Sequence, residues 1–159
     1  VALLRAKGSP VFCWIVGGPG SWLGAYKRRA EEKGLTGKDI RFQGAIPVRR
    51  VPSAIAACDV CVYPAPKSRN PYFLRDTSPL KLFEYLAARK PIVCADLPPI
   101  RDIVSDRVVH FCVPGDAKSL AQAIMKAIEH PLHHPEERAE IVHRHSWVQR
   151  MERILAEAV

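Results

Sequence analysis

The sequence predicts an α/β protein in which a Rossmann-like parallel sheet is flanked by helices. Short apolar runs rich in β-branched residues alternate along the chain with segments of helical spacing. The apolar runs are nearly continuous, as in strands that are covered on both faces. With 159 residues, of which 48% are hydrophobic and 25% charged, the chain can bury a core and suits a single domain over residues 1–159.

Strands are expected where β-branched and aromatic residues form short runs that end near Gly or Pro. The first run ends in a glycine-rich turn that includes Gly17 and Gly18, and the third is closed by Pro64 and Pro66. The expected strands are 11–16, 40–42, 59–63, 91–95 and 108–113.

Helices are expected where apolar residues recur every three or four positions. Gly34 stops the first of them, and Pro52 fits the first turn of the second. The segment 117–130 is clearly amphipathic. The expected helices are 22–33, 49–58, 79–88, 100–104, 117–130, 135–145 and 146–158.

In an open parallel sheet, ligands bind beyond the carboxyl ends of the strands. This rule directs the search for a site to the loops that follow the expected strands. Those loops are 17–21, 44–48, 64–78, 96–99 and 114–116.

The net charge of +8 is unevenly distributed. Residues 1–70 contain 12 Lys or Arg and 4 Asp or Glu, whereas residues 71–159 contain 12 of each kind. The basic half could attract phosphate, nucleic acid or an anionic membrane surface, or it could simply form solvated helix faces. No recognition-helix motif or aromatic-interleaved basic stripe supports nucleic-acid binding, so we expect none.

The five cysteines are an odd number in apolar surroundings, which indicates buried free thiols in a reducing compartment. Cys58 and Cys61 form a C-x-x-C pair, but no second pair completes a zinc site, so we expect no metal. Trp14 and Trp147 are expected in the core. No apolar run is long enough to span a bilayer.

The segment from Asp76 to Val93 is the most informative for function. Ser78 is a good N-cap, Pro79 suits the first helical position, and the N–H groups of Leu80 and Lys81 would then form an anion site. A lysine in the first turn opposes the helix dipole, and an anionic ligand such as phosphate would reverse that cost. Alternatively, Lys81 pairs with Asp76 or with solvent.

Glu84 lies in the second turn of this helix, between two aromatic residues. A carboxylate among apolar neighbours needs a hydrogen-bond donor. The hydroxyls of a ribose would serve, as would an ion pair within the protein.

This segment resembles the signature of the retaining group-1 (family 4) glycosyltransferases, which have the GT-B fold. Asp76 and Glu84 show the spacing of that family's E-x7-E motif, with Asp in place of the first Glu. The stretches 15–19, 40–44, 56–64, 113–116 and 146–147 resemble other parts of the family in the same order. The resemblance covers nearly the whole chain.

The resemblance implies a role for each candidate residue. Glu84 would hold the ribose of the nucleotide, Asp76 would lie near the donor sugar, and the turn Thr77–Lys81 would hold the diphosphate. The remaining candidates are Ser78 and Leu80 for the diphosphate, Gly44, Ala45 and Ile46 for the base, and Gly17 and Gly18 for the phosphates or the acceptor.

The resemblance further implies transfer of a sugar from a UDP-sugar or GDP-sugar to an acceptor hydroxyl with retention, in cell-envelope or polysaccharide biosynthesis. No metal and no cofactor would be needed, and no Asp-x-Asp motif is present. Because the chain begins at Val1 without an initiator Met, we expect it to lack the family's first strand and its N-terminal acceptor domain. Alone, it would bind nucleotide without turnover.

Three departures from the family pattern affect the site, and the most serious is that the family's phosphate-binding Arg and Lys, on its first strand and the loop after it, have no counterpart here. Asp76 is one methylene shorter than the family's Glu, and Arg89 stands where the family often has Gly. A non-catalytic module that uses the basic half on an anionic partner is the second hypothesis, and a nicotinamide-dependent redox enzyme the weakest. The intact enzyme is expected in the cytoplasm, with peripheral contact at the inner face of the membrane.

Overall fold

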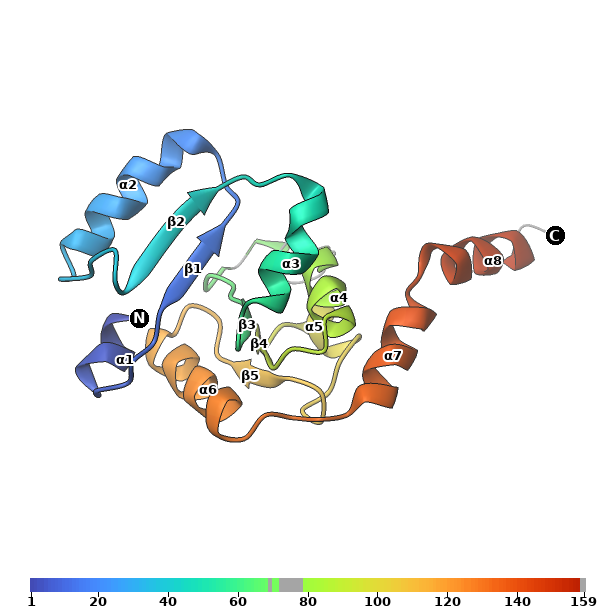
Figure 1. Cartoon of the computed structure of the whole chain (residues 1–159). Coiled ribbons are helices and arrows are strands. Elements are labelled where there is room, and N and C mark those ends of the chain that lie inside the picture. The colour runs from blue at the N-terminus through green and yellow to red at the C-terminus, as the bar shows by residue number, and fades with distance from the viewer. Residues whose placement is uncertain (69, 72–78, 158–159) are drawn as a thin grey trace. The chain divides into compact units, whose positions relative to one another are not determined.

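The computed structural model describes residues 1–68, 70–71 and 79–157, whose strands form two parallel sheets (Figure 1). The chain divides into two compact units, Val1–Ser53 and Ala54–Val159, and each is described by itself. All described strand pairs are parallel, which confirms the predicted α/β class with helices flanking parallel sheets. Within each unit, the described strands pair with one another, and the single domain expected over residues 1–159 stays a prediction.

The first unit contains two α-helices, a short 3-10 helix and a sheet of two strands. Cys13 pairs with Ile40, and the register shifts between Ile15 and Val16. Its elements are α1 (Ala2–Ala6), β1 (Cys13–Val16), α2 (Gly20–Glu31), β2 (Ile40–Gly44) and η1 (Val48–Arg50).

Asp39 ties the turn before β2 to α1. One carboxylate oxygen accepts hydrogen bonds from the backbone N–H and the hydroxyl of Thr36, at 2.9 and 2.8 Å. The other oxygen lies 2.8 Å from Nε of Arg5. The hydrogen bonds from Thr36 hold the pKa of Asp39 below its usual range, so this carboxylate stays ionised at neutral pH.

The second unit is built on a three-stranded sheet in the order β3-β4-β5. The central strand is buried at all four residues, as expected for a parallel strand covered on both faces. Its elements are α3 (Val51–Ala56, which crosses the boundary), β3 (Cys61–Tyr63), α4 (Leu80–Ala87), β4 (Ile92–Ala95), α5 (Pro98–Arg101), β5 (His110–Cys112), α6 (Ala117–Glu129), α7 (Pro135–Arg144) and α8 (Trp147–Glu157).

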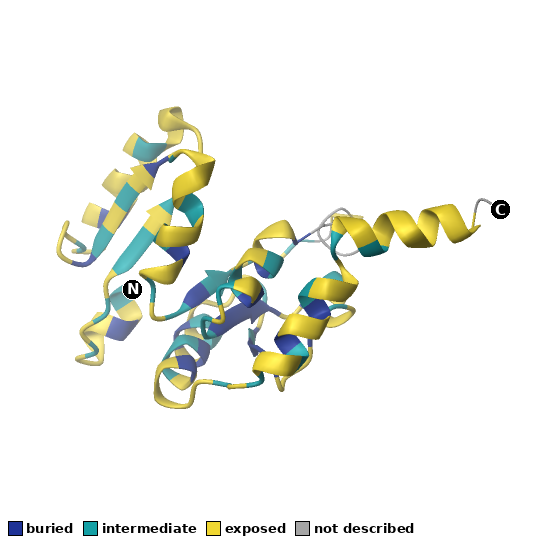
Figure 2. Ribbon diagram, turned by 45° about the vertical axis from the view of Figure 1, so that its right-hand side comes forward, coloured by how far each residue is buried: buried dark blue, intermediate teal, exposed yellow. Residues whose placement is uncertain are grey.

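Helices α4 and α6 lie on opposite faces of this sheet (Figure 1). Figure 2 shows the buried residues of the unit gathered on its strands and on the helix faces turned toward them. The main cluster joins α4, β4, α5 and α7, and includes Leu82, Leu86, Ile92, Ile100 and Ile141. Burial of aliphatic side chains at roughly 1.5–3 kcal/mol each makes this cluster the dominant stabilising feature of the unit.

The cysteines are free thiols, as predicted. Cys61, Cys94 and Cys112 are buried, and the other two are half-buried. Burial raises the pKa of Cys61 and of Cys94 to about 12, so both remain protonated and unreactive at neutral pH.

A buried arginine and a buried histidine were not anticipated from the sequence. Arg138 of α7 donates to the carbonyls of Lys90, Val108 and Leu132 at 2.8–2.9 Å. Nε2 of His110 lies 3.0 Å from the carbonyl of His130. Arg138 therefore connects α7 to the residues that precede β4 and β5 and to the segment before α7, and all three acceptors are backbone carbonyls.

The last helix corrects one expectation about the core. Trp147 is 74% exposed, and no residue of α8 in the described range is buried, so the prediction that Trp147 is a core residue is wrong. The helix is amphipathic, but its apolar side packs on nothing within the described residues (Figure 2). Across those same residues, no helix has the length and apolarity that crossing a membrane requires.

Candidate functional site

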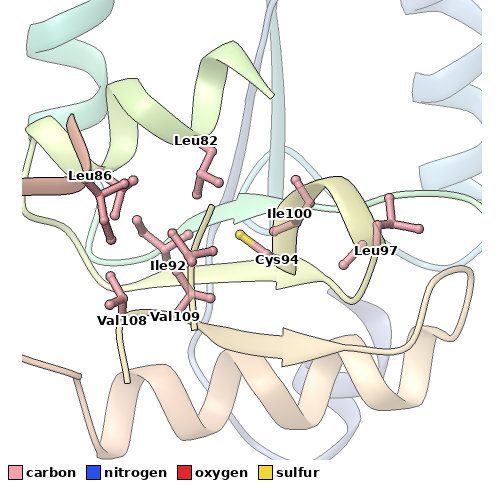
Figure 3. Close-up of a cluster of buried hydrophobic side chains, with 11 residues drawn as sticks. Leu82, Leu86, Ile92, Cys94, Leu97, Ile100, Val108 and Val109 are labelled. Atoms are coloured by element: carbon pink, nitrogen blue, oxygen red, sulfur yellow. The ribbon is translucent and has the colours of Figure 1, made fainter. Parts of the chain in front are cut away.

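Helix α4 carries the sequence-predicted residues Leu80, Lys81 and Glu84 on its exposed side. Leu82 and Leu86, one turn apart, are buried in the main cluster and fix the opposite side of the helix (Figure 3). Leu80 is 64% exposed despite being apolar, and Lys81 and Glu84 are exposed as well. The core thus holds the helix in place while its polar residues face outward.

The start of α4 differs by one residue from the prediction. Pro79 is the N-cap rather than the first helical residue, because its ψ of 62° is outside the helical range. No described side chain caps the helix, and the carbonyl of Pro79 accepts from the N–H of Leu82 at 2.9 Å. Within the described residues, the N–H groups of Leu80 and Lys81 have no acceptor, as at the start of any helix without a cap, and the anion site expected there stays a prediction.

The side chains of Glu84 and Lys81 form no ion pair and no hydrogen bond with any described residue. The intraprotein ion pair considered for Glu84 is therefore not made within residues 1–68, 70–71 and 79–157. A pair between Lys81 and Asp76 lies outside the described residues. What the structure shows is an exposed carboxylate and an exposed ammonium group three residues apart, on one side of a fixed helix.

Three further predicted residues lie outside the described range. They are Asp76, expected near the donor sugar, and Thr77 and Ser78, expected at the diphosphate. Their roles remain predictions.

The first unit brings two of the predicted loops together. The N–H of Gly17, directly after β1, donates to the carbonyl of Gly44, the last residue of β2, at 2.7 Å. Both strands present their carboxyl ends here, which is the ligand-binding end of an open parallel sheet. Ala45 is exposed and Ile46 half-buried in the loop that follows.

The backbone conformation explains why glycines occupy this turn. Gly17, Gly18 and Gly44 have φ values of 106°, 88° and 73°, which side chains rarely adopt. A Cβ atom added at Gly17 or Gly18 would meet no heavy atom within 4 Å. The space beside this turn is therefore open, so a ligand could approach its backbone closely.

The loop after β4 contains a carboxylate, Asp96, that is already bound by an arginine. Asp96 accepts two hydrogen bonds from Arg101, at 2.7 and 2.9 Å, which lower the pKa of this carboxyl. Arg101 also binds Asp106 at 2.9 Å, and its guanidinium carbon lies 3.6 Å from the ring centre of Phe111. This network is explained by local structure and offers no free group to a ligand.

A cavity of about 350 Å³ lies between the residues that follow β3 and the start of α6. Its lining is mostly apolar, with Pro64, Pro66, Val113 and Leu120 among the wall residues. Two of the loops that the sequence indicated, 64–78 and 114–116, contribute residues to these walls. Their proximity could not be predicted, because the two segments lie far apart in the sequence. Over the described residues, no group of three His, Cys, Asp or Glu side chains is placed to hold a metal ion.

Comparison with protein families gives one match. A family model described as "Glycosyl transferases group 1" matches residues 1–130. A comparison with curated protein sequences finds no match.

Solved structures of glycosyltransferases have the same fold. HepE from Anabaena, in complex with UDP-glucose, matches with a TM-score of 0.73 and 21% identity. Sucrose-phosphate synthase from Thermosynechococcus elongatus matches at 0.67 and 18%, and WaaG, a glycosyltransferase involved in lipopolysaccharide biosynthesis, at 0.59 and 17%. The matches cover 98%, 99% and 84% of this chain, but only 44%, 42% and 33% of the respective neighbours.

Proposed function

The chain belongs to the group 1 glycosyl transferases, and we propose that it binds the nucleotide-sugar donor of an enzyme that transfers the sugar to an acceptor hydroxyl with retention. It spans less than half the length of HepE and of sucrose-phosphate synthase. In the intact enzyme, an N-terminal domain would bind the acceptor. The 159-residue chain is therefore expected to bind nucleotide without turnover.

The observation that carries the proposal is the exposed side of α4. Within the described residues, an uncapped helix start, an exposed lysine in the first turn and an exposed carboxylate without an ionic partner one turn later occur together on a helix anchored by Leu82 and Leu86. A lysine near the positive end of a helix is unfavourable on its own. An anionic ligand at this position would reverse the sign of that interaction and explain the arrangement.

On this proposal, α4 binds the diphosphate and the ribose together. The N–H groups of Leu80 and Lys81, the ammonium of Lys81 and the helix dipole stabilise the charge that develops on the departing diphosphate. Glu84 accepts hydrogen bonds from the two ribose hydroxyls. Thr77 and Ser78 would add donors to the diphosphate, and Asp76 would orient the donor sugar.

The glycine turns of the first unit are proposed to meet the rest of the donor. The loop Gly44–Ile46 would contact the base through backbone groups, and the turn at Gly17 and Gly18 would lie against the phosphates or the acceptor. Support comes from the hydrogen bond between Gly17 and Gly44 and from the open space beside the turn.

The donor is proposed to be a UDP-sugar or GDP-sugar. HepE was solved with UDP and with UDP-glucose, which favours the uridine donor. Stabilisation of the leaving diphosphate by dipole, backbone and lysine would make a metal ion and a cofactor unnecessary. Retention fits a front-face attack in which the leaving phosphate takes up the acceptor's proton.

The test is a calorimetric titration of the chain with UDP, GDP, ADP and NAD. We expect saturable binding of one diphosphate, and a loss of at least about tenfold in affinity in Glu84→Ala, since a charged hydrogen-bonding pair is worth about 1.5–3 kcal/mol. The control is Glu129→Ala, which removes the exposed carboxylate of the last residue of α6. Equal binding by wild type and Glu84→Ala would reject the ribose role.

Lys81 has a close control in Lys118, because both are exposed lysines at the second position of a helix. Lys81→Ala should weaken UDP or GDP about tenfold and leave the matching nucleoside unchanged. Lys118→Ala should change neither. Equal weakening of diphosphate and nucleoside by Lys81→Ala would contradict a phosphate contact.

The basic first unit supports a second candidate function. Residues 1–53 contain 10 Lys or Arg and 3 Asp or Glu, and Trp22 and Tyr26 are exposed one turn apart on α2. This surface suits peripheral contact of a cytoplasmic enzyme with an anionic membrane, or a non-catalytic module that binds an anionic partner. Sedimentation with anionic and neutral vesicles tests it, and polyanion binding with a steep salt slope, without nucleotide binding, would favour the module.

A further inference from the structure

Three aromatic rings form a row on the first unit. Trp22 and Tyr26 lie one turn apart on α2, with ring centres 6.5 Å apart and ring planes at 77°. The ring of Tyr26 also stacks on that of Phe42 in β2, with centres 6.3 Å apart and planes at 8°. The sheet therefore supports the row, but Trp22 is still 57% exposed and Tyr26 48% exposed.

Two cations continue this row along the helix. At 3.6 residues per turn, Arg29 lies on the same side of α2 as the two aromatic residues, and Lys33 follows one turn later, just after the helix. Both cations are exposed, and neither has an ionic partner among the residues that the structure describes. These four residues, Trp22, Tyr26, Arg29 and Lys33, are referred to as the α2 stripe.

The positive charge of this unit is largely unpaired. Of its 10 Lys and Arg, only Arg5 forms an ion pair with a described residue. The acidic residues closest in sequence to the end of α2, Glu31 and Glu32, are offset from the α2 stripe by about a quarter to half of a turn around the helix. The charge of the stripe is therefore available to an anionic partner.

The arrangement of the rings distinguishes between kinds of anionic partner. Single-stranded nucleic acid stacks its bases on open ring faces, whereas here the two exposed rings are nearly perpendicular and Tyr26 already stacks on Phe42. The interface of a bilayer requires no such alignment. Trp and Tyr enter it because each has an apolar ring and one polar group, and Lys and Arg attract anionic lipids.

We propose that the α2 stripe is the surface through which this chain binds an anionic lipid bilayer. Trp22 and Tyr26 enter the headgroup region, and Arg29 and Lys33 bind lipid phosphates. This inference rests on the membrane contact of the proposed function and assigns it to one side of one helix. Each cation near an anionic leaflet raises the affinity roughly fivefold, and salt screens this part of the attraction.

The first experiment is sedimentation of the full chain with vesicles of equal parts phosphatidylglycerol and phosphatidylcholine, or of phosphatidylcholine alone. We expect binding to the anionic vesicles, weakened at least about tenfold in the double variant Arg29→Gln/Lys33→Gln. The control, Lys118→Gln/Lys126→Gln, removes the same charge from two exposed lysines of α6 and should change binding less than about twofold. Equal losses in both double variants would show that net charge alone is responsible, and would overturn the proposal.

Tryptophan emission locates the contact, because a tryptophan that leaves water emits at shorter wavelength. We expect anionic vesicles to cause this shift in wild type and in Trp147→Phe, but not in Trp22→Phe. Trp147 is a demanding control, since it is 74% exposed on the amphipathic helix α8. Loss of the shift in Trp147→Phe instead would assign the contact to α8. Cation-dependent binding without any shift would indicate a polyanion site, and either result contradicts the α2 stripe.

Titration of the same wild-type chain with UDP and GDP separates this proposal from donor binding. Vesicle binding that depends on the α2 stripe, without nucleotide binding, would support the stripe and reject the donor function. Vesicle binding that none of the α2 variants changes would reject the stripe and keep the membrane contact. Absence of vesicle binding in wild type would reject both the stripe and the membrane contact.

Discussion

The two units of the chain differ in how far their sheets are covered. In residues 1–53, the only buried apolar side chains are Leu4 and Ala30, and Phe12 and Ile15 of the sheet region are exposed. In residues 54–159, β4 is buried at every position between two neighbouring strands. A pair of strands is marginal in water, whereas three strands with covered faces can be stable. Stability is therefore concentrated in the second unit.

The two units also differ in net charge and in which of the proposed donor-binding groups they contain. Residues 1–53 have a net charge of +7, whereas residues 54–159 have 14 Lys or Arg and 13 Asp or Glu. The glycine turns proposed to meet the donor lie in the less stable, basic unit, and the charged side of α4 lies in the stable one. A bound diphosphate would stabilise the first unit by mass action, so ligand binding and folding are expected to be linked there.

The largest expected effect comes from separating the units at Pro47, before η1. Residues 48–159 should fold with a cooperative urea transition, because they retain the three-stranded sheet and its core. Residues 1–47 should be unfolded, because two strands and two helices, one of them only five residues long, bury too little apolar surface. Circular dichroism and amide proton spectra of the two peptides, beside the full chain, measure this. A cooperative transition in residues 1–47 would contradict the expected difference in stability between the two units.

The second effect tests the buried cation of the stable unit. Arg138→Ala leaves three backbone carbonyls without donors, so we expect the free energy of unfolding to fall by about 3 kcal/mol. Arg144→Ala, six residues along the same helix, removes an exposed pair with Glu140 and should cost about 0.5 kcal/mol or less. Urea titrations measure both. A loss below about 1 kcal/mol for Arg138→Ala would show that other contacts hold α7.

Local sequence patterns were enough to predict most of the fold. Parallel strands, the order of helices and the long helix α6 follow from periodicity and from Gly and Pro, and their ends agree within a few residues. Trp147 was misplaced because apolar spacing predicts an amphipathic face but not whether anything covers it. Which strands pair with one another depends on contacts between distant segments, which periodicity does not report.

For the site, the sequence singled out Lys81 and Glu84 because they stand out against their apolar neighbours, and the structure places both on the exposed side of α4, while their roles stay predictions. It did not identify Arg138, which lies in a stretch of ordinary helical charge pattern and is buried only through three distant carbonyls. The sequence also did not predict the close approach of Gly115 to Lys67, where a Cβ atom added at Gly115 would lie 2.6 Å from the backbone nitrogen of Lys67. A glycine beside Pro predicts a turn, but not which distant segment lies against it.

The third prediction concerns the pH dependence of the stability of the second unit. Burial lowers the pKa of His110, and the nearby cations Lys126 and Arg138 lower it further. The folded protein therefore favours the neutral ring of His110. The contribution of this ring to the free energy of unfolding is present above the unfolded pKa of about 6.5 and is lost as the pH falls through the lower pKa of the folded state. The urea midpoint should decline from pH 7.5 to 5.

His110→Gln isolates this contribution, because glutamine can still donate to the carbonyl of His130 but does not titrate. We expect the variant to show a shallower decline, and His133→Gln, at an exposed position, to keep the wild-type slope. Parallel curves for wild type and His110→Gln would assign the acid sensitivity to other groups.

The smallest effect concerns a strained backbone position in the stable unit, where, among its described residues, Arg89 is the non-glycine residue with a positive φ. Among the described residues of the first unit, every positive φ belongs to a glycine, but directly after α4 Arg89 has a φ of 57°. A side chain in this conformation costs roughly 1–2 kcal/mol, which the greater freedom of unfolded glycine partly offsets on substitution. Arg89→Gly should therefore raise the free energy of unfolding by about 0.5 kcal/mol. Gln122→Gly, within α6, should lower it by about 1 kcal/mol, and a loss in both variants would mean that Arg89 makes a compensating contact at the end of α4.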